Sequence, residues 1–114
     1  MVAKSRRLSV SVSPQALSSL DEILDWNIAK YGADHAHRYI AFLKSQTAKL
    51  ETEYHRGKSI PGRRERQFIT VQRRRKGHGH VVAYEVIGET VHVLNYFHTA
   101  QDWRRHLRSM LPKP

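Results

Sequence analysis

The sequence predicts an α+β fold in which a helical hairpin packs on a small, mostly antiparallel β-sheet. Two stretches with apolar residues at helical spacing, 14–31 and 34–55, follow each other with a very short link, which indicates two antiparallel helices. Residues 80–98 then alternate β-branched and aromatic side chains on either side of Gly88, as the two strands of a hairpin do. Both faces of this hairpin are apolar, so we expect it to lie centrally in the sheet with helices covering at least one face.

The first expected elements are a short strand and the first helix. Residues 8–12 alternate between Leu or Val and Ser, which predicts a strand that follows a basic lead over residues 1–7. Ser13 is a favourable N-cap, and Pro14 suits the first helical position because the N–H that it lacks has no partner there. Gly32 is placed to end the helix in a left-handed conformation.

The second half of the chain supplies the remaining strands and a last helix. Residues 59–62 read Ser-Ile-Pro-Gly, which indicates a turn, and residues 66–76 predict a strand loaded with cations. An amphipathic pattern closed by a proline predicts a short helix over residues 100–111. The expected order is therefore β-α-α-β-β-β(-α), in a single domain that spans residues 1–114.

The composition of the chain limits the classes of protein to which it can belong. The net charge of +10 implies an acidic partner such as nucleic acid or an acidic protein, although positive charge also serves solubility alone. The chain contains no Cys, so disulfides and thiolate metal sites are excluded. No apolar run approaches the roughly 20 residues of a membrane span, and the first residues lack the apolar segment of a signal peptide. We therefore expect a cytoplasmic protein without membrane contact.

The cations are concentrated in one part of the chain. Residues 56–76 contain nine Lys or Arg side chains against the single acid Glu65. At least one face of the strand that carries them must meet solvent or a partner, because burying unpaired guanidinium groups is very costly. The alternative is a solvated basic edge that prevents aggregation between sheets.

The histidines mark a second candidate region. His80 and His98 stand at the two ends of the predicted hairpin, so antiparallel pairing brings them together at one end of the sheet. We expect Arg75, Lys76 and the start of the helix at Trp103 to lie close to that end, which makes it the best candidate site. A histidine there could act as a general base, or His98 could simply order a turn.

Metal and cofactor sites are not expected. His35 and His37, like His78 and His80, are spaced two apart, but no carboxylate or Cys stands at a spacing that would complete a metal site. The sequence also lacks a glycine-rich phosphate loop and a nucleophile elbow.

Several segments, taken in order over residues 8–105, resemble the RelE/ParE superfamily of toxins of type II toxin–antitoxin systems, and within it the ParE branch. They lie in both helices, in the turn before the sheet, and in the last two strands and the residues after them. The segments are Leu20-Asp21-Glu22-Ile23, Tyr31-Gly32-Ala33, Arg38-Tyr39-Ile40, Pro61-Gly62-Arg63-Arg64, Ala83-Tyr84-Glu85-Val86, and Leu94-Asn95-Tyr96-Phe97-His98 with Asp102.

The resemblance implies an inhibitor of DNA gyrase that stalls the cleaved enzyme–DNA complex. It also implies a ParD-like antitoxin whose C-terminal segment wraps the helices and the sheet, commonly in a 2:2 complex. It implies neither catalytic residues nor cofactors. We expect basic residues and one histidine to meet the target: Arg63, Arg64, Arg66, Arg73, Arg74, Arg75, Lys76, His98, Arg104 and Arg105.

For the antitoxin, we expect large apolar anchors on the helices, since aromatic side chains dominate such interfaces. The candidates are Trp26, Phe42, Trp103 and Leu107. The alternative for the three aromatic residues is that they belong to the core.

Two other functions stay open. The sister RelE branch cleaves mRNA on the ribosome; in that case Arg73 and Arg75 would stabilise the charge on phosphorus, and His80 and His98 would move protons. Residues 99–103 lack the Arg or terminal Tyr of that branch, which disfavours this ribosome-dependent endoribonuclease. A plain nucleic-acid-binding module is the third reading, although few aromatic residues interleave the basic block.

Overall fold

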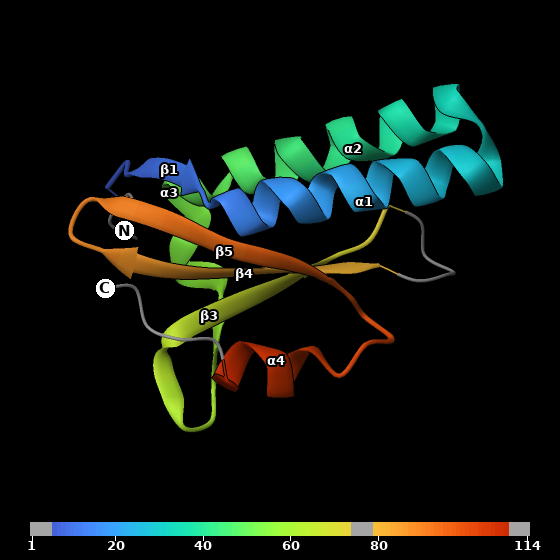
Figure 1. Cartoon of the computed structure of the whole chain (residues 1–114). Coiled ribbons are helices and arrows are strands. Elements are labelled where there is room, and N and C mark those ends of the chain that lie inside the picture. The colour runs from blue at the N-terminus through green and yellow to red at the C-terminus, as the bar shows by residue number, and fades with distance from the viewer. Residues whose placement is uncertain (1–5, 74–78, 110–114) are drawn as a thin grey trace.

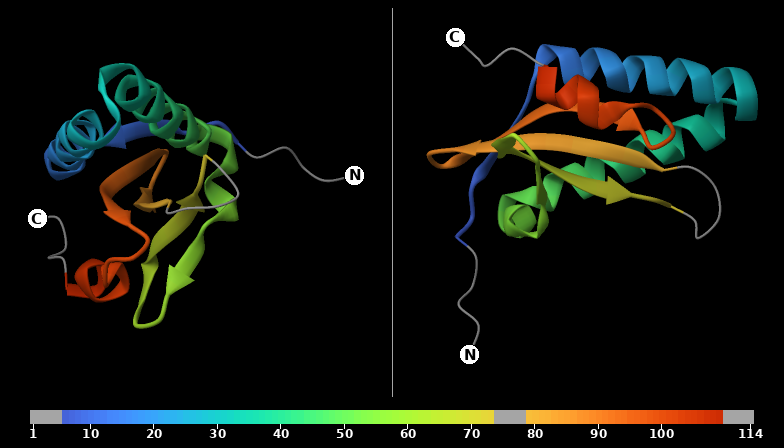
Figure 2. Two further views of the ribbon diagram at one scale, coloured as in Figure 1. Left: turned by 90° about the vertical axis from the view of Figure 1, so that its right-hand side faces the viewer. Right: turned by 90° about the horizontal axis from the view of Figure 1, so that it is seen from below.

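The computed structural model describes residues 6–73 and 79–109 as a five-stranded sheet with helices on both faces (Figure 1). The α1–α2 hairpin covers one face, and the short helix α4 lies on the other (Figure 2). The elements are β1 (Ser9–Val12), α1 (Pro14–Tyr31), α2 (Ala33–Ala48), α3 (Leu50–Glu53), a 3₁₀ turn (Tyr54–Arg56), β2 (Lys58–Ile60), β3 (Arg63–Val71), β4 (His80–Ile87), β5 (Thr90–His98) and α4 (Trp103–Ser109). This architecture confirms the predicted α+β fold and its order of elements.

The β4–β5 hairpin is central, as the alternation predicted. The sheet order is β1-β5-β4-β3-β2, and β4 pairs with β5 from His80 opposite His98 to Ile87 opposite Thr90. Gly88 has φ +60°, whereas no described residue other than glycine has positive φ. Positive φ at the first central residue alone is the type II′ pattern, and its twist suits the flanking strands.

Alternate residues of β4 enter two separate cores. Val82 and Tyr84 pack under the helical hairpin with Leu43, whereas Val81 and Ala83 pack against α4. All five side chains are fully buried. The period of two along the strand therefore supplies both faces with apolar contacts, which explains why the run reads as apolar throughout.

The ends of α1 follow the predicted chemistry. Ser13 Oγ accepts a hydrogen bond from the Ala16 N–H at 3.0 Å, and Pro14 is the first helical residue. Gly32 ends α1 with φ +91° and donates its N–H to the Ile28 carbonyl. Such a positive φ strains any residue with a Cβ, so the link to α2 depends on glycine. None of the described helices is both long and apolar enough to cross a bilayer.

The basic strand differs from the expectation in its limits. β3 begins at Arg63 and ends at Val71, so Arg73 lies beyond the strand and does not alternate along it. A further strand, Lys58–Ile60, which the sequence did not indicate, pairs with β3 before the Pro61–Gly62 turn. Residues 74–76 lie outside the described residues, so the positions of Arg74, Arg75 and Lys76 stay untested.

Candidate functional site

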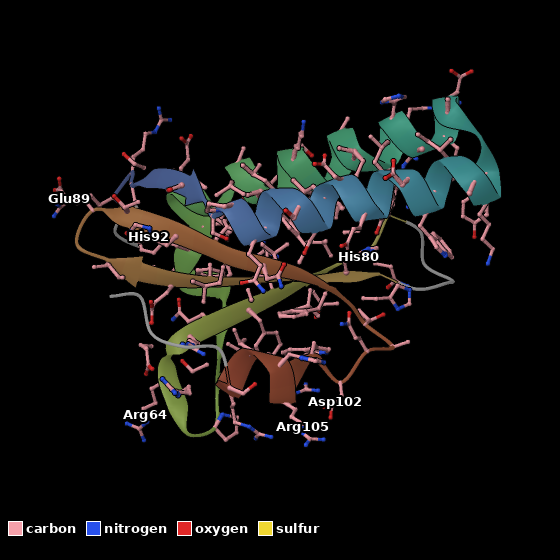
Figure 3. All side chains as sticks on the ribbon, in the orientation of Figure 1. Arg64, His80, Glu89, His92, Asp102 and Arg105 are labelled. Carbon is pink, nitrogen blue, oxygen red and sulfur yellow. The ribbon has the colours of Figure 1, made fainter. Side chains whose placement is uncertain are left out.

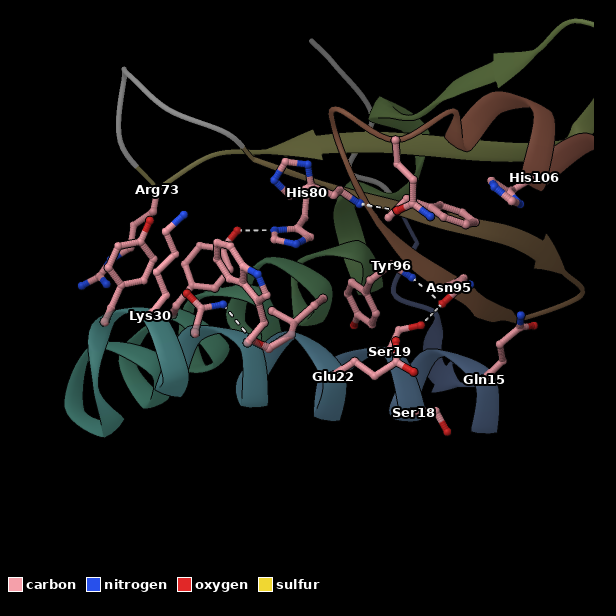
Figure 4. Close-up of a pocket in the computed structure, with 18 of the residues that line it drawn as sticks. Gln15, Ser18, Ser19, Glu22, Lys30, Arg73, His80, Asn95, Tyr96 and His106 are labelled. Atoms are coloured by element: carbon pink, nitrogen blue, oxygen red, sulfur yellow. Dashed lines mark hydrogen bonds between the residues drawn. The ribbon is translucent and has the colours of Figure 1, made fainter.

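A groove of about 1230 Å³ runs between α1 and the far end of β5, close to α4 (Figure 4). Its α1 wall carries Trp26 and Lys30, and its floor carries His80 and Tyr96. Arg73 stands at its rim, where β3 has ended. The groove therefore coincides with the end of the sheet at which the sequence placed a candidate site.

His80 and His98 meet there as the hairpin register requires. Their rings are 5.4 Å apart between centroids and nearly perpendicular. His80 Nδ1 shares a hydrogen bond with the Tyr39 hydroxyl of α2. Burial, and secondarily the neighbouring His98, lower the pKa of His80 to about 4. Burial likewise raises the pKa of Tyr39 to about 12, so both partners of this hydrogen bond are uncharged at pH 7.

His98 orders the turn that leads to α4. Its Nδ1 accepts the Ala100 N–H at 3.1 Å, and its own N–H donates to Gln101 Oε1 at 3.1 Å. His98 therefore has the turn-ordering role that the sequence offered as the alternative to catalysis. Arg73, His80 and His98 all line the groove, which brings together three of the four residues that a ribonuclease reading requires; Arg75 is outside the described residues.

The edge of β5 that faces the groove is capped by side chains. β1 pairs only with Thr90–Val93, so no strand of the described part of the chain lies on that side of the later β5 residues. There, Asn95 Oδ1 accepts the Tyr96 N–H at 2.9 Å and a hydrogen bond from Ser19 Oγ. An unpaired strand edge invites aggregation, and these contacts satisfy part of it internally. The sequence offered one signal for this, an Asn inside a strand of β-branched and aromatic residues.

The four predicted antitoxin anchors do not share one surface. Trp26 is 54 % exposed, and Phe42 is half-buried beside Tyr39. Trp103 and Leu107 are only 5 % and 0 % exposed and belong to the core between α4 and the sheet. Those two are therefore not available to a partner in this conformation, because α4 turns its apolar side onto the sheet.

Trp26 forms part of an exposed aromatic lip on the groove. Its ring lies 6.0 Å from that of Tyr31, which is 52 % exposed. The Lys30 ammonium stands 4.8 Å from the Trp26 centroid and 5.9 Å from the Tyr31 centroid. A cation over two aromatic faces is attracted by their quadrupoles, so this lip combines apolar area with positive charge.

Among the predicted target-binding cations, Arg66 is placed differently from the rest. Its side chain is 3 % exposed and donates from Nη1 to the Leu107 carbonyl, near the end of α4. Its Nε has no hydrogen-bond partner among the described residues. Burial first, and Arg63 second, lower the pKa of Arg66. Arg66 thus fastens α4 to β3 and does not present its charge to a target.

Other arginines that were predicted to bind the target lie at the surface of the protein. Arg64, Arg104 and Arg105 are exposed and Arg63 is half-buried. Arg64 and Arg105 both point away from the helical hairpin, on the α4 side of the sheet (Figure 3). Within the described residues, no group of three or more His, Asp or Glu side chains could hold a metal ion.

Comparison with known proteins gives two findings that agree. A family model described as the ParE toxin of the type II toxin–antitoxin system, parDE, matches residues 10–103. A chain of the chromosomal ParDE TA system from P. aeruginosa has a TM-score of 0.68 and 19 % sequence identity, with 82 % of this chain and 97 % of that chain covered. At 19 % sequence identity, this structural similarity supports the fold alone. No curated protein sequence matches.

Proposed function

This chain belongs to the ParE toxin family of type II toxin–antitoxin systems, and we propose that it inhibits DNA gyrase by binding and is neutralised by a cognate antitoxin. The family match over residues 10–103 is the observation that carries the proposal. The exposed cations on β3 and α4 support it, since they suit the acidic surfaces of an enzyme–DNA complex.

Ribosome-dependent mRNA cleavage is the second candidate, because Arg73, His80 and His98 share one groove. The state of His80 weighs against it. With a pKa of about 4 and 9 % exposure, this histidine holds almost no proton at pH 7 and cannot serve as a general acid there. Its ring is also engaged by Tyr39.

Two parallel assays separate these functions. Purified toxin is added to a gyrase supercoiling and cleavage reaction and to an in vitro translation reaction. We expect lost supercoiling with trapped cleaved DNA, and intact mRNA. Cut mRNA beside unaffected gyrase would refute gyrase inhibition and make the histidine pair catalytic; the His98→Gln variant would then abolish cutting.

We assign the groove beside α1 to the antitoxin segment. Its lining follows α1 from Gln15 to Tyr31. Its lip is the exposed aromatic pair Trp26 and Tyr31, the side-chain type that anchors protein interfaces. A helix or strand of the antitoxin that lies in it would contact both the helices and the sheet. The mass of the purified complex tests whether its stoichiometry is 2:2.

Replacing Trp26 by Ala is expected to weaken antitoxin binding about 10- to 30-fold, because an exposed aromatic anchor of an interface contributes roughly 1.5–2 kcal/mol or more. Isothermal titration with the purified antitoxin measures the change in Kd. Leu17→Ala is the matched control: Leu17 is 52 % exposed on the same helix but does not line the groove. Equal effects of the two substitutions would contradict the assignment.

A further inference from the structure

We propose that β2, the start of β3 and α4 together form a surface that binds the phosphate backbone of duplex DNA directly. This inference rests on the proposed function, because it names DNA as the toxin's contact in the gyrase–DNA complex. We call this surface the basic face. Its cations are Lys58, Arg63, Arg64, Arg104, Arg105 and Arg108.

The charge of the molecule is divided between the two sides of the sheet. Three acids lie on or beside the basic face: Glu65, Asp102 and Glu85, which stands opposite Arg66 in the β3–β4 register. Glu65 forms an ion pair with Arg63 at 3.6 Å. The helical hairpin on the opposite side, residues 14–48, carries four acids against three Lys or Arg residues. Within residues 6–73 and 79–109, the excess of positive charge is therefore concentrated on the basic face. A role in solubility alone does not require such a concentration.

Contacts between β3 and α4 fix the position of the helix that carries three of these cations. The rings of Phe68 and Trp103 are 4.5 Å apart, and Arg66 donates to the Leu107 carbonyl. The Arg104 guanidinium lies 4.2 Å from the Trp103 centroid and 5.6 Å from that of Phe68. Because the Arg104 guanidinium already rests on these two rings, it loses little freedom when it binds an anion.

The absence of exposed apolar anchors favours a polyanion over an acidic protein. The large apolar side chains that the described part of the chain exposes are Leu17, Trp26, Ile28, Tyr31 and Ile87, and none of them lies on β2, β3 or α4. Protein interfaces depend on buried aromatic and apolar anchors, whereas phosphate contacts need only donors and positive charge. Arginine in particular matches phosphate oxygens with its planar fork.

The same surface is unsuited to single strands. Its aromatic rings, Phe68 and Trp103, lie beneath Arg104, and Trp103 is 5 % exposed. Bases of a single strand stack on exposed aromatic faces, which the basic face lacks. The basic face therefore fits the phosphate backbone of a duplex.

The family match ends at residue 103, so the three arginines of α4 lie beyond the part that this chain shares with the family model.

Duplex binding is measured without gyrase. Fluorescence anisotropy of the full-length toxin with a 30-base-pair labelled duplex, at several salt concentrations, should show binding that is independent of sequence. For about four phosphate contacts, log K should fall against log salt with a slope near −3.6. The double variant Arg64→Ser/Arg105→Ser should reduce this slope by about 2 and weaken binding at least tenfold at 100 mM salt.

The double variant Arg38→Ser/Lys44→Ser is the matched control, because it removes the same charge from exposed residues of α2. We expect it to change duplex affinity less than about threefold. Equal losses in the two variants would overturn the proposal, because binding would then follow net charge alone. Equal or tighter binding of a single strand, or of poly-glutamate, would overturn it as well.

The gyrase assay keeps this inference separate from the proposed function. Gyrase inhibition by a toxin that does not bind the duplex would refute the basic face as a DNA surface and leave the function intact. Duplex binding by a toxin that leaves gyrase unaffected would support the DNA surface and refute gyrase inhibition.

Discussion

Replacing Trp103 by Ala is expected to lower the free energy of unfolding by about 3–5 kcal/mol, the usual cost of truncating a buried Trp or Phe. Trp103 is 5 % exposed and packs with Phe68 and Leu107 against the α4 side of the sheet. A domain of this size has only about 5–15 kcal/mol in total, so the loss is large. Urea denaturation followed by circular dichroism measures it.

The same substitution decides between two roles for Trp103. The sequence suggested it as an antitoxin anchor, whereas its burial makes it a core residue. Unchanged stability together with weaker antitoxin binding would show that Trp103 acts at an interface. Trp26→Ala is the comparison, because Trp26 is 54 % exposed and its truncation should change stability by less than about 1 kcal/mol.

Local patterns predicted the elements and registers that depend on neighbours in the chain. Alternation and a two-residue turn fix the β4–β5 pairing, so His80 and His98 could be placed together without a structure. The Ser13 cap and the stop at Gly32 depend on backbone groups within a few residues. Such signals do not require knowledge of the tertiary packing.

The errors concern burial, which no local pattern of charged or aromatic residues decides. Arg66 looks like a surface cation in the sequence, but α4 covers it and offers the Leu107 carbonyl as its partner. Helix C-terminal carbonyls attract cations, and this pairing joins residues 41 apart in the sequence. β2 was missed because a three-residue strand next to Pro61 carries too short a pattern to recognise.

A groove lies at the end of the sheet where the sequence placed a candidate site, but the sequence did not indicate most of the residues that line it. The groove at the His80–His98 end includes Arg73, whereas Arg75 and Lys76, which were expected there, lie outside the described residues. Much of the wall comes from α1, including Trp26 and Lys30. How α1 crosses the sheet depends on packing between its apolar stripe and the strands. The hydrogen bond between Tyr39 and His80 likewise joins α2 to β4, and no spacing in the sequence indicates it.

Lowering the pH from 7 to 4.5 is expected to destabilise the protein by about 2.5 kcal/mol through His80 alone. The pKa of His80 is about 4 in the folded protein, against about 6.5 in an unfolded chain. Between these values the unfolded state binds the extra proton, so stability is full above pH 6.5 and is lost as the pH falls toward 4. Urea denaturation at both pH values measures the difference.

His80→Gln isolates this effect, because glutamine keeps a polar group near Tyr39 but does not titrate. Carboxylates also lose charge as the pH falls, so the wild type should lose more than 2.5 kcal/mol in total, and the variant should lose about 2.5 kcal/mol less than the wild type. His37→Gln is the matched control on the exposed side of α2 and should follow the wild type. If His80→Gln instead loses as much stability as the wild type, protonation of His80 does not destabilise the folded protein. Burial against Tyr39 would then not lower the pKa of His80. The low pKa would no longer argue against a role for His80 in proton transfer in the groove.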